Sequence, residues 1–247
     1  QVPPGIALLE EAGLRYTRAV GNLQNLKLAA GDGDSPATTG LGHTRWATHG
    51  GVPEANAHPL AGGDPEELAI VLHGIVENYR QLRGRLREAG HVFTSETDAE
   101  TVTHLIEEHY DGDLVEATRR AFNELEGHFA FVAIHRDHPG LLVGARHQCP
   151  LVVGVGRGET FLASNASAFL RETREVHFPE DGDLVAISAD GARFLRADDG
   201  SAVDRELIEL DWDDESAEKA GFETFMLKEI YEQPDAVAET IGDRVRH

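Results

Sequence analysis

The part of the sequence that most constrains the fold is Leu41-Gly42-His43-Thr44-Arg45-Trp46-Ala47-Thr48-His49-Gly50-Gly51, followed by Asn56-Ala57-His58-Pro59. Arg45 carries a planar set of donors that can bind both oxygens of a carboxylate, and Thr48 and His49 can add further hydrogen bonds. The glycines between them allow the backbone to approach a ligand closely. The stretch therefore predicts a pocket that binds a carboxylate.

Two other interpretations of this stretch remain open. It can be the polar end of a strand whose side chains satisfy one another. Alternatively, His43, His49 and His58 can be metal ligands, although no carboxylate or cysteine stands beside them in a ligand pattern. We therefore predict no metal and no cofactor.

Two further segments carry polar groups where a strand or loop meets a helix. The segment Ile70–Tyr79 runs from a strand through Gly74 into a helix, and such a corner leaves backbone N–H groups that can bind an oxyanion. It can also be an ordinary strand–helix turn. In Ser95-Glu96-Thr97-Asp98-Ala99-Glu100, Asp98 can accept hydrogen bonds from an ammonium group, or it can simply favour a helix N-terminus.

Composition narrows the class of protein. The chain has 247 residues, 40% of them hydrophobic, which is enough for one large or two small domains with real cores. No apolar run reaches the roughly 20 residues of a membrane helix, so no membrane partner is expected. The lone Cys149 excludes an internal disulfide and favours a reducing, cytoplasmic setting.

The charge is strongly acidic, with a formal net value of −22. Such a surface would repel nucleic acid, so we expect no nucleic-acid partner. Lysine occurs only at Lys27, Lys219 and Lys228, a pattern similar to that of proteins from halophiles. The simpler interpretation is a solvated acidic surface that indicates no particular binding partner.

Periodicity predicts strands, then a helical block, then more strands, which indicates an α+β fold. The first strand-like runs are Gly5–Glu10, Leu14–Val20, Leu41–Arg45 and Ala69–Leu72. The predicted helices are Glu77–Ala89, Asp98–Tyr110 and Asp113–Leu125. The later strands are Phe129–Ile134, Leu141–Ala145, Leu151–Val155, Thr160–Ser164, Asp183–Ser188 and Arg193–Leu195. Asp198–Glu218 is expected to be irregular, and Pro234 to break a helix over Phe222–Ile241.

Five motifs in this order resemble those of the class II glutamine amidotransferases, and among them the glutamine–fructose-6-phosphate aminotransferases. That family carries His-Thr-Arg-Trp-Ala-Thr-His-Gly, Asn-Ala-His-Pro, His-Asn-Gly-Ile-Ile-Glu-Asn, Ser-Glu-Thr-Asp-Thr-Glu and Lys-Glu-Ile-Tyr-Glu-Gln-Pro. The corresponding segments here are His43–Gly50, Asn56–Pro59, His73–Asn78, Ser95–Glu100 and Lys228–Pro234. The similarity spans essentially the whole chain. It implies a four-layer α-β-β-α sandwich of the N-terminal-nucleophile (Ntn) type.

The resemblance also implies a set of site residues. In the loop, Arg45, Thr48 and His49 would hold the α-carboxylate of glutamine, with Trp46 as a supporting residue. Asp98 would bind the α-ammonium together with the Gly74 backbone, and the Gly74 N–H would contribute to the oxyanion hole.

Two departures from the family pattern affect catalysis. The family begins with Cys-Gly-Ile, whose cysteine is the nucleophile, whereas this sequence begins Gln1-Val2-Pro3-Pro4 and resembles a later family segment. The first strand and helix of the sandwich are therefore expected to be absent. Cys149 is interpreted as a packing residue. The family's His-Asn-Gly is interpreted as shortened to His73-Gly74, without the Asn that donates to the oxyanion; losing one such donor costs about 10²–10³ in rate.

We therefore expect a glutaminase domain at residues 1–232 and the start of a linker at 233–247, leading towards an absent sugar-isomerase domain. The resemblance implies release of ammonia from glutamine for glucosamine 6-phosphate synthesis in the cytoplasm. Fructose 6-phosphate would bind only through the isomerase domain, and the full-length enzyme would be a homodimer. The alternatives are a catalytically dead glutamine-binding or interaction module and an incomplete record of an active enzyme.

Overall fold

Two long strands, β5 (Leu68–Val76) and β6 (Gly127–His135), lie side by side in the largest sheet of the computed structural model. The structure describes residues 3–31, 35–45, 51, 53–63, 66–211 and 221–242. β5 and β6 pair antiparallel, residue for residue, from Leu68 opposite His135 to Val76 opposite Gly127. Because both faces of β6 are buried, it is a continuous apolar run rather than an alternating one.

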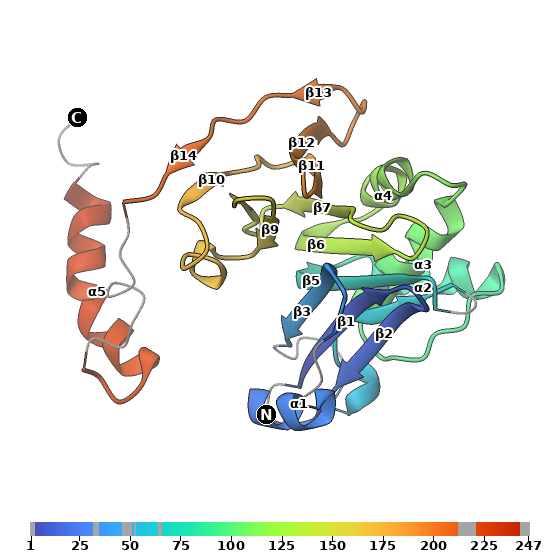
Figure 1. Ribbon diagram of the computed structural model, residues 1–247, viewed down its shortest axis with the longest axis horizontal. Helices are drawn as coiled ribbons and strands as arrows, with labels where there is room; N and C mark the ends of the chain where they lie inside the picture. Colours follow the sequence, from blue (N-terminus) through green and yellow to red (C-terminus); the bar gives the residue numbers. More distant parts are fainter. Residues whose placement is uncertain are drawn as a thin grey trace. The chain divides into compact units, whose positions relative to one another are not determined.

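The central sheet has seven antiparallel strands in the order β13-β12-β11-β7-β6-β5-β4 (Figure 1). Its other members are β4 (Leu60–Gly62), β7 (Leu142–His147), β11 (Asp183–Ser188), β12 (Gly191–Arg196) and β13 (Ala202–Val203). A second sheet has the order β2-β1-β3, with β1 (Pro4–Glu10), β2 (Gly13–Arg18) and β3 (Thr39–Thr44). A third has the order β14-β10-β8-β9, with β8 (Val152–Val155), β9 (Thr160–Ala163), β10 (Glu175–His177) and β14 (Ile208–Glu209).

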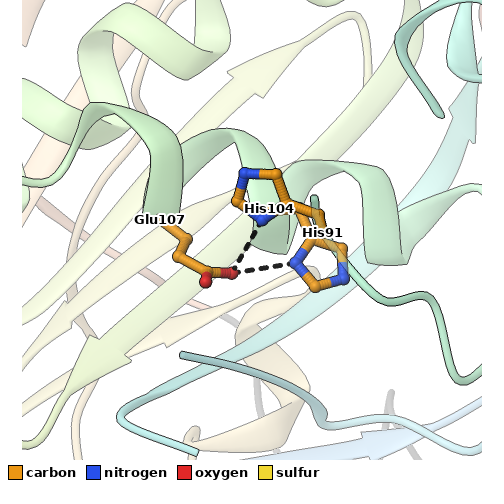
Figure 2. Close-up of side chains that lie close together, drawn as sticks. All are labelled: His91, His104 and Glu107. Carbon is orange, nitrogen blue, oxygen red and sulfur yellow. Dashed lines mark hydrogen bonds and ion pairs between the residues drawn. The ribbon is translucent and has the colours of Figure 1, made fainter. Parts of the chain in front are cut away.

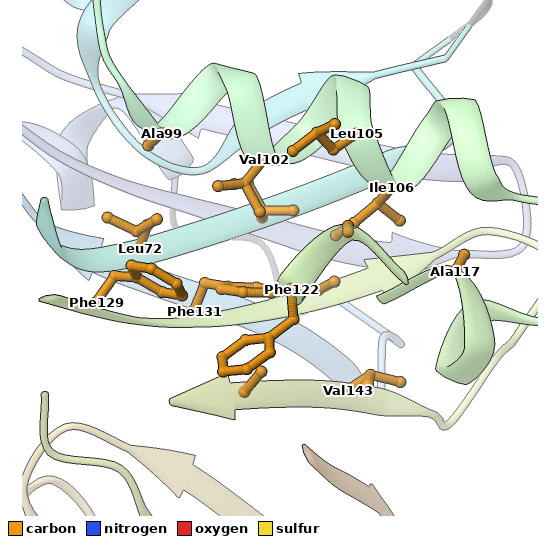
Figure 3. Packing of buried hydrophobic residues seen from close by; sticks show 14 of the residues in the cluster. Leu72, Ala99, Val102, Leu105, Ile106, Ala117, Phe122, Phe129, Phe131 and Val143 are labelled. Atoms are coloured by element: carbon orange, nitrogen blue, oxygen red, sulfur yellow. The ribbon is translucent and has the colours of Figure 1, made fainter. Parts of the chain in front are cut away.

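Three helices cover one face of the central sheet: α2 (Tyr79–Glu88), α3 (Ala99–His109) and α4 (Leu114–Phe122). Figure 3 shows Val102 and Ile106 of α3 above Phe129 and Phe131 of β6, within one buried cluster. The alternate residues of β6, Ala130, Val132 and Ile134, point to the opposite face and pack with residues of β1, β3 and β8. The layers are helices, the central sheet and smaller sheets, which makes the fold an α+β sandwich.

Periodicity located the main elements correctly. The three expected helices correspond to α2, α3 and α4 within a few residues at each end, and Asp183–Ser188 is β11 with the same bounds. Helix α1 (Leu23–Ala30) was not expected, because Leu26 is its one buried residue and an apolar stripe is missing. Its caps could have revealed it, since the Asn22 side chain accepts from the Asn25 N–H and Gly31 ends the helix.

The expectation that Pro234 breaks the last helix was wrong. Helix α5 (Phe225–Gly242) continues across Pro234. Its described side chains around Pro234 are exposed, so water can bind the Ile230 carbonyl that proline leaves without an N–H donor. The chain divides into two compact units, with the division between Ile208 and Glu209. The domain boundary expected at 232/233 falls inside α5. Among the described helices, none is both long and apolar enough to cross a membrane.

Candidate active site

The edge of β5 beyond Ile70 is the backbone wall of the site. Strand β4 covers this edge only from Leu68 to Ile70. Further along, the Leu72 N–H donates to Nδ1 of His58 at 3.2 Å, and the Val76 N–H donates to Oδ2 of Asp98 at 2.8 Å. In an antiparallel ladder alternate N–H groups point to the same side, so the Gly74 N–H lies on this edge between them.

Gly74 can be nothing but glycine in this backbone. Its φ is +104°, and an added Cβ would lie 2.1 Å from the His128 carbonyl oxygen and 2.8 Å from the Phe129 Cα. Both neighbours are backbone atoms of β6 and cannot move aside. The close approach of β5 to β6 at this point therefore depends on the absence of a side chain.

Asp98 is buried at the start of α3, where it was expected either to cap the helix or to bind a cation. Its side chain makes no capping hydrogen bond to the helix and instead reaches the Val76 N–H. The preceding loop is held by Glu100, whose carboxylate accepts from the backbone N–H groups of Thr94 and Ser95 and from both hydroxyls. Glu100 thus fixes the loop that leads into Asp98.

Arg45 follows β3 and is also buried, at 3% exposed. Its guanidinium donates to the Gly51 carbonyl at 2.6 Å. Burial lowers the pKa of Arg45, and the nearby carboxylates of Asp98 and Glu96 oppose that shift. Glu96 in turn accepts hydrogen bonds from the Asn56 amide and the Gly51 N–H, so the loop after Arg45 is tied to the loop before Asp98.

One cavity of about 220 Å³ brings these groups together. The structure therefore unites three of the predicted site residues, Arg45, Gly74 and Asp98, around one space. Its size lies below the range typical of sites for drug-sized ligands and suits a smaller molecule. The remaining lining residues are His43, Thr44, His58, Leu72, His73, Ile75, Thr97 and Ala99. The predicted site residues Trp46, Thr48 and His49 lie outside the residues that the structure describes.

His43 and His58 form part of the cavity wall as stacked rings, with centroids 4.5 Å apart. Burial lowers the pKa of His43 to about 4 and the pKa of His58 well below its ordinary value. Both rings are therefore neutral at pH 7. In the described part of the chain neither ring belongs to a group of three potential metal ligands, and His49 is not described.

The missing Asn of the family motif is a substitution rather than a deletion. The motif matches over Gly74–Asn78, and counting back from Gly74 puts His73 at the family's Asn position and Leu72 at its His position. β5 pairs with β6 without a bulge, and Leu68, Leu72 and Val76 all contribute to the core beneath the helices. Matching the two histidines by residue type would instead require a gap of one residue. The exposed His73 side chain lines the cavity, where an imidazole N–H can also donate.

A larger, mainly apolar cavity of about 610 Å³ adjoins the site and shares His43, Thr44, Leu72 and His73 with it. It lies between β3, β5, β6 and β9 and contains neither Arg45 nor Asp98, so the smaller cavity is the better site for a polar ligand. Cys149 packs against the core between the sheets, and burial raises the pKa of its thiol. This environment suits a packing residue better than a nucleophile.

Sequence reasoning missed the contributions of His43, His73 and Glu96. Glu96 stood inside a quoted motif, but nothing local indicates that it would bind Asn56 and Gly51. His73 could have been found by aligning the motif on its glycine. His43 was considered only as a metal ligand, whereas its neutral ring is a wall of the cavity.

Comparison with known proteins shows the family of the chain. The pattern of the glutamine amidotransferase domain family matches residues 43–171, more than half of the chain. The chain belongs to this family. The domain is 47% identical over 98% of its length to a glutamine–fructose-6-phosphate aminotransferase (isomerizing) of Streptomyces coelicolor, and 46% identical over 98% to one of Thermus thermophilus. It spans about two fifths of the length of these relatives, 39% and 40% respectively.

Solved structures support the amidotransferase fold at low sequence identity. A glutamine phosphoribosylpyrophosphate amidotransferase from B. subtilis superimposes with a TM-score of 0.70 at 21% identity, covering 81% of this domain and 44% of that chain. A glutamine aminotransferase class-II domain protein from Silicibacter pomeroyi gives 0.55 at 18%, covering 78% and 90%. These similarities establish the fold alone. They agree with the Ntn-type sandwich expected from the sequence.

Proposed function

We propose that this amidotransferase domain binds glutamine in the 220 Å³ cavity and serves the release of its amide nitrogen as ammonia. The observation that carries the proposal is that Arg45 and Asp98, one cation and one anion, line the same small space beside Gly74. A free amino acid needs an opposite charge for its carboxylate and another for its ammonium group, a short distance apart. Both side chains are buried, which strengthens such contacts.

Each residue has a distinct role in this proposal. Arg45 binds the α-carboxylate, with Thr48 and His49 adding hydrogen bonds and Trp46 supporting the loop. Asp98 binds the α-ammonium. The side-chain amide of the substrate then extends towards the edge of β5.

The oxyanion donors are the backbone N–H of Gly74 and the side chain of His73. The neighbouring N–H groups on this edge, of Leu72 and Val76, already bind His58 and Asp98. That arrangement leaves Gly74 as the backbone donor facing the cavity. His73 takes the position of the Asn in the family motif and can donate through its ring N–H.

The chemistry follows the nucleophilic route of this enzyme class. A cysteine thiolate attacks the amide carbon of glutamine, ammonia leaves, and water hydrolyses the glutamyl thioester to glutamate. Cys149 is unsuited to this role because it is a packing residue with a raised thiol pKa. We therefore expect the 247-residue chain by itself to release no measurable ammonia.

The names of the relatives suggest the larger context. We propose that the domain belongs to a glutamine–fructose-6-phosphate aminotransferase that passes ammonia to fructose 6-phosphate and forms glucosamine 6-phosphate. The sugar would bind to a separate isomerase domain, and the complete enzyme would be a cytoplasmic homodimer. The glutaminase half-reaction needs no cofactor.

Two measurements test the proposal. Calorimetric titration with glutamine should give binding that Arg45→Gln and Asp98→Asn each abolish, with Asp113→Asn as a control at a helix start outside the cavity. Glutamate release should appear only when the chain is extended by the family's N-terminal segment, which begins Cys-Gly-Ile and includes the first strand and helix. His73→Ala should slow that release more than His73→Asn. Glutamine binding without release in the extended chain would favour the alternative of a dead binding module. Failure of both would overturn the proposal.

A further inference from the structure

A second group of ligating side chains lies on the helical layer, at the opposite end of α3 from Asp98. His91 follows α2, and His104 and Glu107 belong to α3. Figure 2 shows both imidazole rings turned towards one oxygen of the Glu107 carboxylate. Nδ1 of His104 lies 2.8 Å from Oε2 of Glu107, and Nδ1 of His91 lies 3.4 Å from the same oxygen.

The 2.8 Å separation is that of a hydrogen bond between His104 and Glu107, and an ion placed between the three side chains would replace it with a slightly wider spacing. Ligand atoms around a tetrahedral zinc ion, with bonds of about 2.0–2.1 Å, are roughly 3.3 Å apart. The ligand atoms of His91, His104 and Glu107 all lie within 4.8 Å of one another. Two imidazole nitrogens and one carboxylate oxygen form a common zinc ligand set that leaves a fourth position for water.

The buried side of His104 gives an independent indication. Its Nε2 is buried without a hydrogen-bond partner among the described residues, and the ring is 8% exposed. Oε1 of Glu100 lies 3.9 Å from it. In a neutral ring whose proton is on Nδ1, that N–H donates to Glu107, and the lone pair of Nε2 then faces the carboxylate of Glu100. When a cation binds Nδ1, the proton is on Nε2 and points towards Glu100. A carboxylate facing the second ring nitrogen is the arrangement usual around metal-bound histidines.

The other ligands are held in place by the fold. The His91 backbone N–H donates to the Leu86 carbonyl at 3.0 Å, which fixes the chain where α2 ends. The ring of Phe93 packs edge-on against His104. Glu107 remains partly exposed, with a side chain 34% accessible, so an ion can enter from solvent.

A neighbouring group of similar composition provides a contrast. Glu108, His109 and Glu124 also converge, but the Arg85 guanidinium forms ion pairs with both carboxylates of that group. A cation therefore already occupies that position. Arg83 pairs with Glu100.

From these observations we infer that His91, His104 and Glu107 bind a divalent transition-metal ion, zinc fitting best. The ion would join the end of α2 to α3 and so close the segment between His91 and His104, which carries Asp98. The ion would stabilise the structure and take no part in the reaction. The proposed metal site is independent of the glutaminase proposal, because it is tested by zinc binding without glutamine.

The test is titration of the metal-free chain with zinc chloride, followed by calorimetry and by thermal melting. We expect one high-affinity ion per chain and a melting temperature that rises with zinc. Each of His91→Gln, His104→Gln and Glu107→Gln should weaken zinc binding at least about 100-fold, since loss of a direct ligand exceeds the 10–100-fold effect of an outer one. His109→Gln is the matched control and should bind zinc as the wild type does.

Cobalt substitution reports the ligand set directly. A cobalt complex should show visible absorption of a four-coordinate nitrogen–oxygen site, without the near-ultraviolet charge-transfer band that a Cys149 thiolate would add. His91→Gln is the decisive variant because His91 lies in a loop and its replacement leaves the core intact. Circular dichroism of the metal-free variants checks their folding. Unchanged zinc affinity in a folded His91→Gln, loss of binding in His109→Gln, or no binding in the wild type would overturn the inference.

Discussion

The Asp98 carboxylate, at the start of α3, accepts a 2.8 Å hydrogen bond from the Val76 backbone N–H at the end of β5. This contact turns the carboxylate away from the helix that it would otherwise cap and towards the cavity that Arg45 also lines. Because Gly74 lies on the same strand edge, one hydrogen bond sets the position of the anionic group relative to the backbone donor. The geometry of the candidate site thus depends on how α3 meets β5.

Asp98→Asn should remove the negative charge while keeping the size of the side chain. We expect glutamine binding to be lost and the free energy of unfolding to fall by about 2 kcal/mol, since a buried hydrogen bond to a charged acceptor is replaced by a weaker one. Urea denaturation and calorimetry measure the two effects. Asp113→Asn is the control, because asparagine caps α4 as well as aspartate does. If both variants behave like the wild type, Asp98 has no special role.

Gly74→Ala should be severely destabilising. The new Cβ would lie within 3 Å of the His128 carbonyl, the Phe129 Cα and the Cys149 sulfur, at a φ of +104°. We expect a loss of at least about 3 kcal/mol in the free energy of unfolding, or no folded protein.

Gly84→Ala is the matched comparison. Gly84 is a helical residue of α2 whose Cβ would meet nothing within 4 Å, so alanine should stabilise the domain by about 1 kcal/mol. Denaturation midpoints for the two variants should move in opposite directions. A tolerated alanine at Gly74 would mean that the approach of β5 to β6 is looser than described.

Acidification should weaken the fold through His43. Burial lowers the pKa of His43 to about 4, below the ordinary value near 6.5, so between these pH values the imidazole is protonated in the unfolded chain and neutral in the folded one. The contribution of neutral His43 to the free energy of unfolding is therefore complete above pH 6.5. It is lost as the pH falls towards 4, by up to about 3 kcal/mol. His58, whose pKa is lowered further, acts in the same direction.

The measurement is the free energy of unfolding from pH 7.5 to pH 5, above the range in which most carboxylates titrate. His43→Gln should be less stable than the wild type at pH 7.5 but should lose less stability on acidification. The difference between the two slopes isolates His43 from the acidic surface, whose self-repulsion falls with pH in both proteins. Identical slopes would contradict the assignment.

Salt should stabilise the domain. The net charge of −22 produces self-repulsion that mobile ions screen, with a Debye length of about 10 Å at 0.1 M and about 3 Å at 1 M. We expect the chain to be marginal in dilute buffer and its melting temperature to rise by several degrees in molar potassium chloride. Sucrose of equal osmolality controls for general exclusion effects. A high melting temperature at low salt would contradict this expectation.

Local pattern in the sequence determined a large part of the fold. The helical spacing of apolar residues in 98–110 and the apolar run over Asp183–Ser188 sufficed to locate α3 and β11, because a buried face repeats with the period of its own element. The ordered motifs around Arg45, Gly74 and Asp98 also identified the candidate site residues and the family. Elements with little burial, such as α1, left no such pattern.

Only the tertiary structure brought these residues to one cavity. Arg45 and Asp98 line one cavity because β3 ends, and α3 begins, beside the open edge of β5. The register of β5 with β6 decides which N–H groups face that edge. The same holds for His91, whose backbone is held by the Leu86 carbonyl after α2 and whose side chain reaches Glu107 of α3. Periodicity reports which face of an element is buried; contacts between distant segments depend on pairing and packing, which no local pattern records.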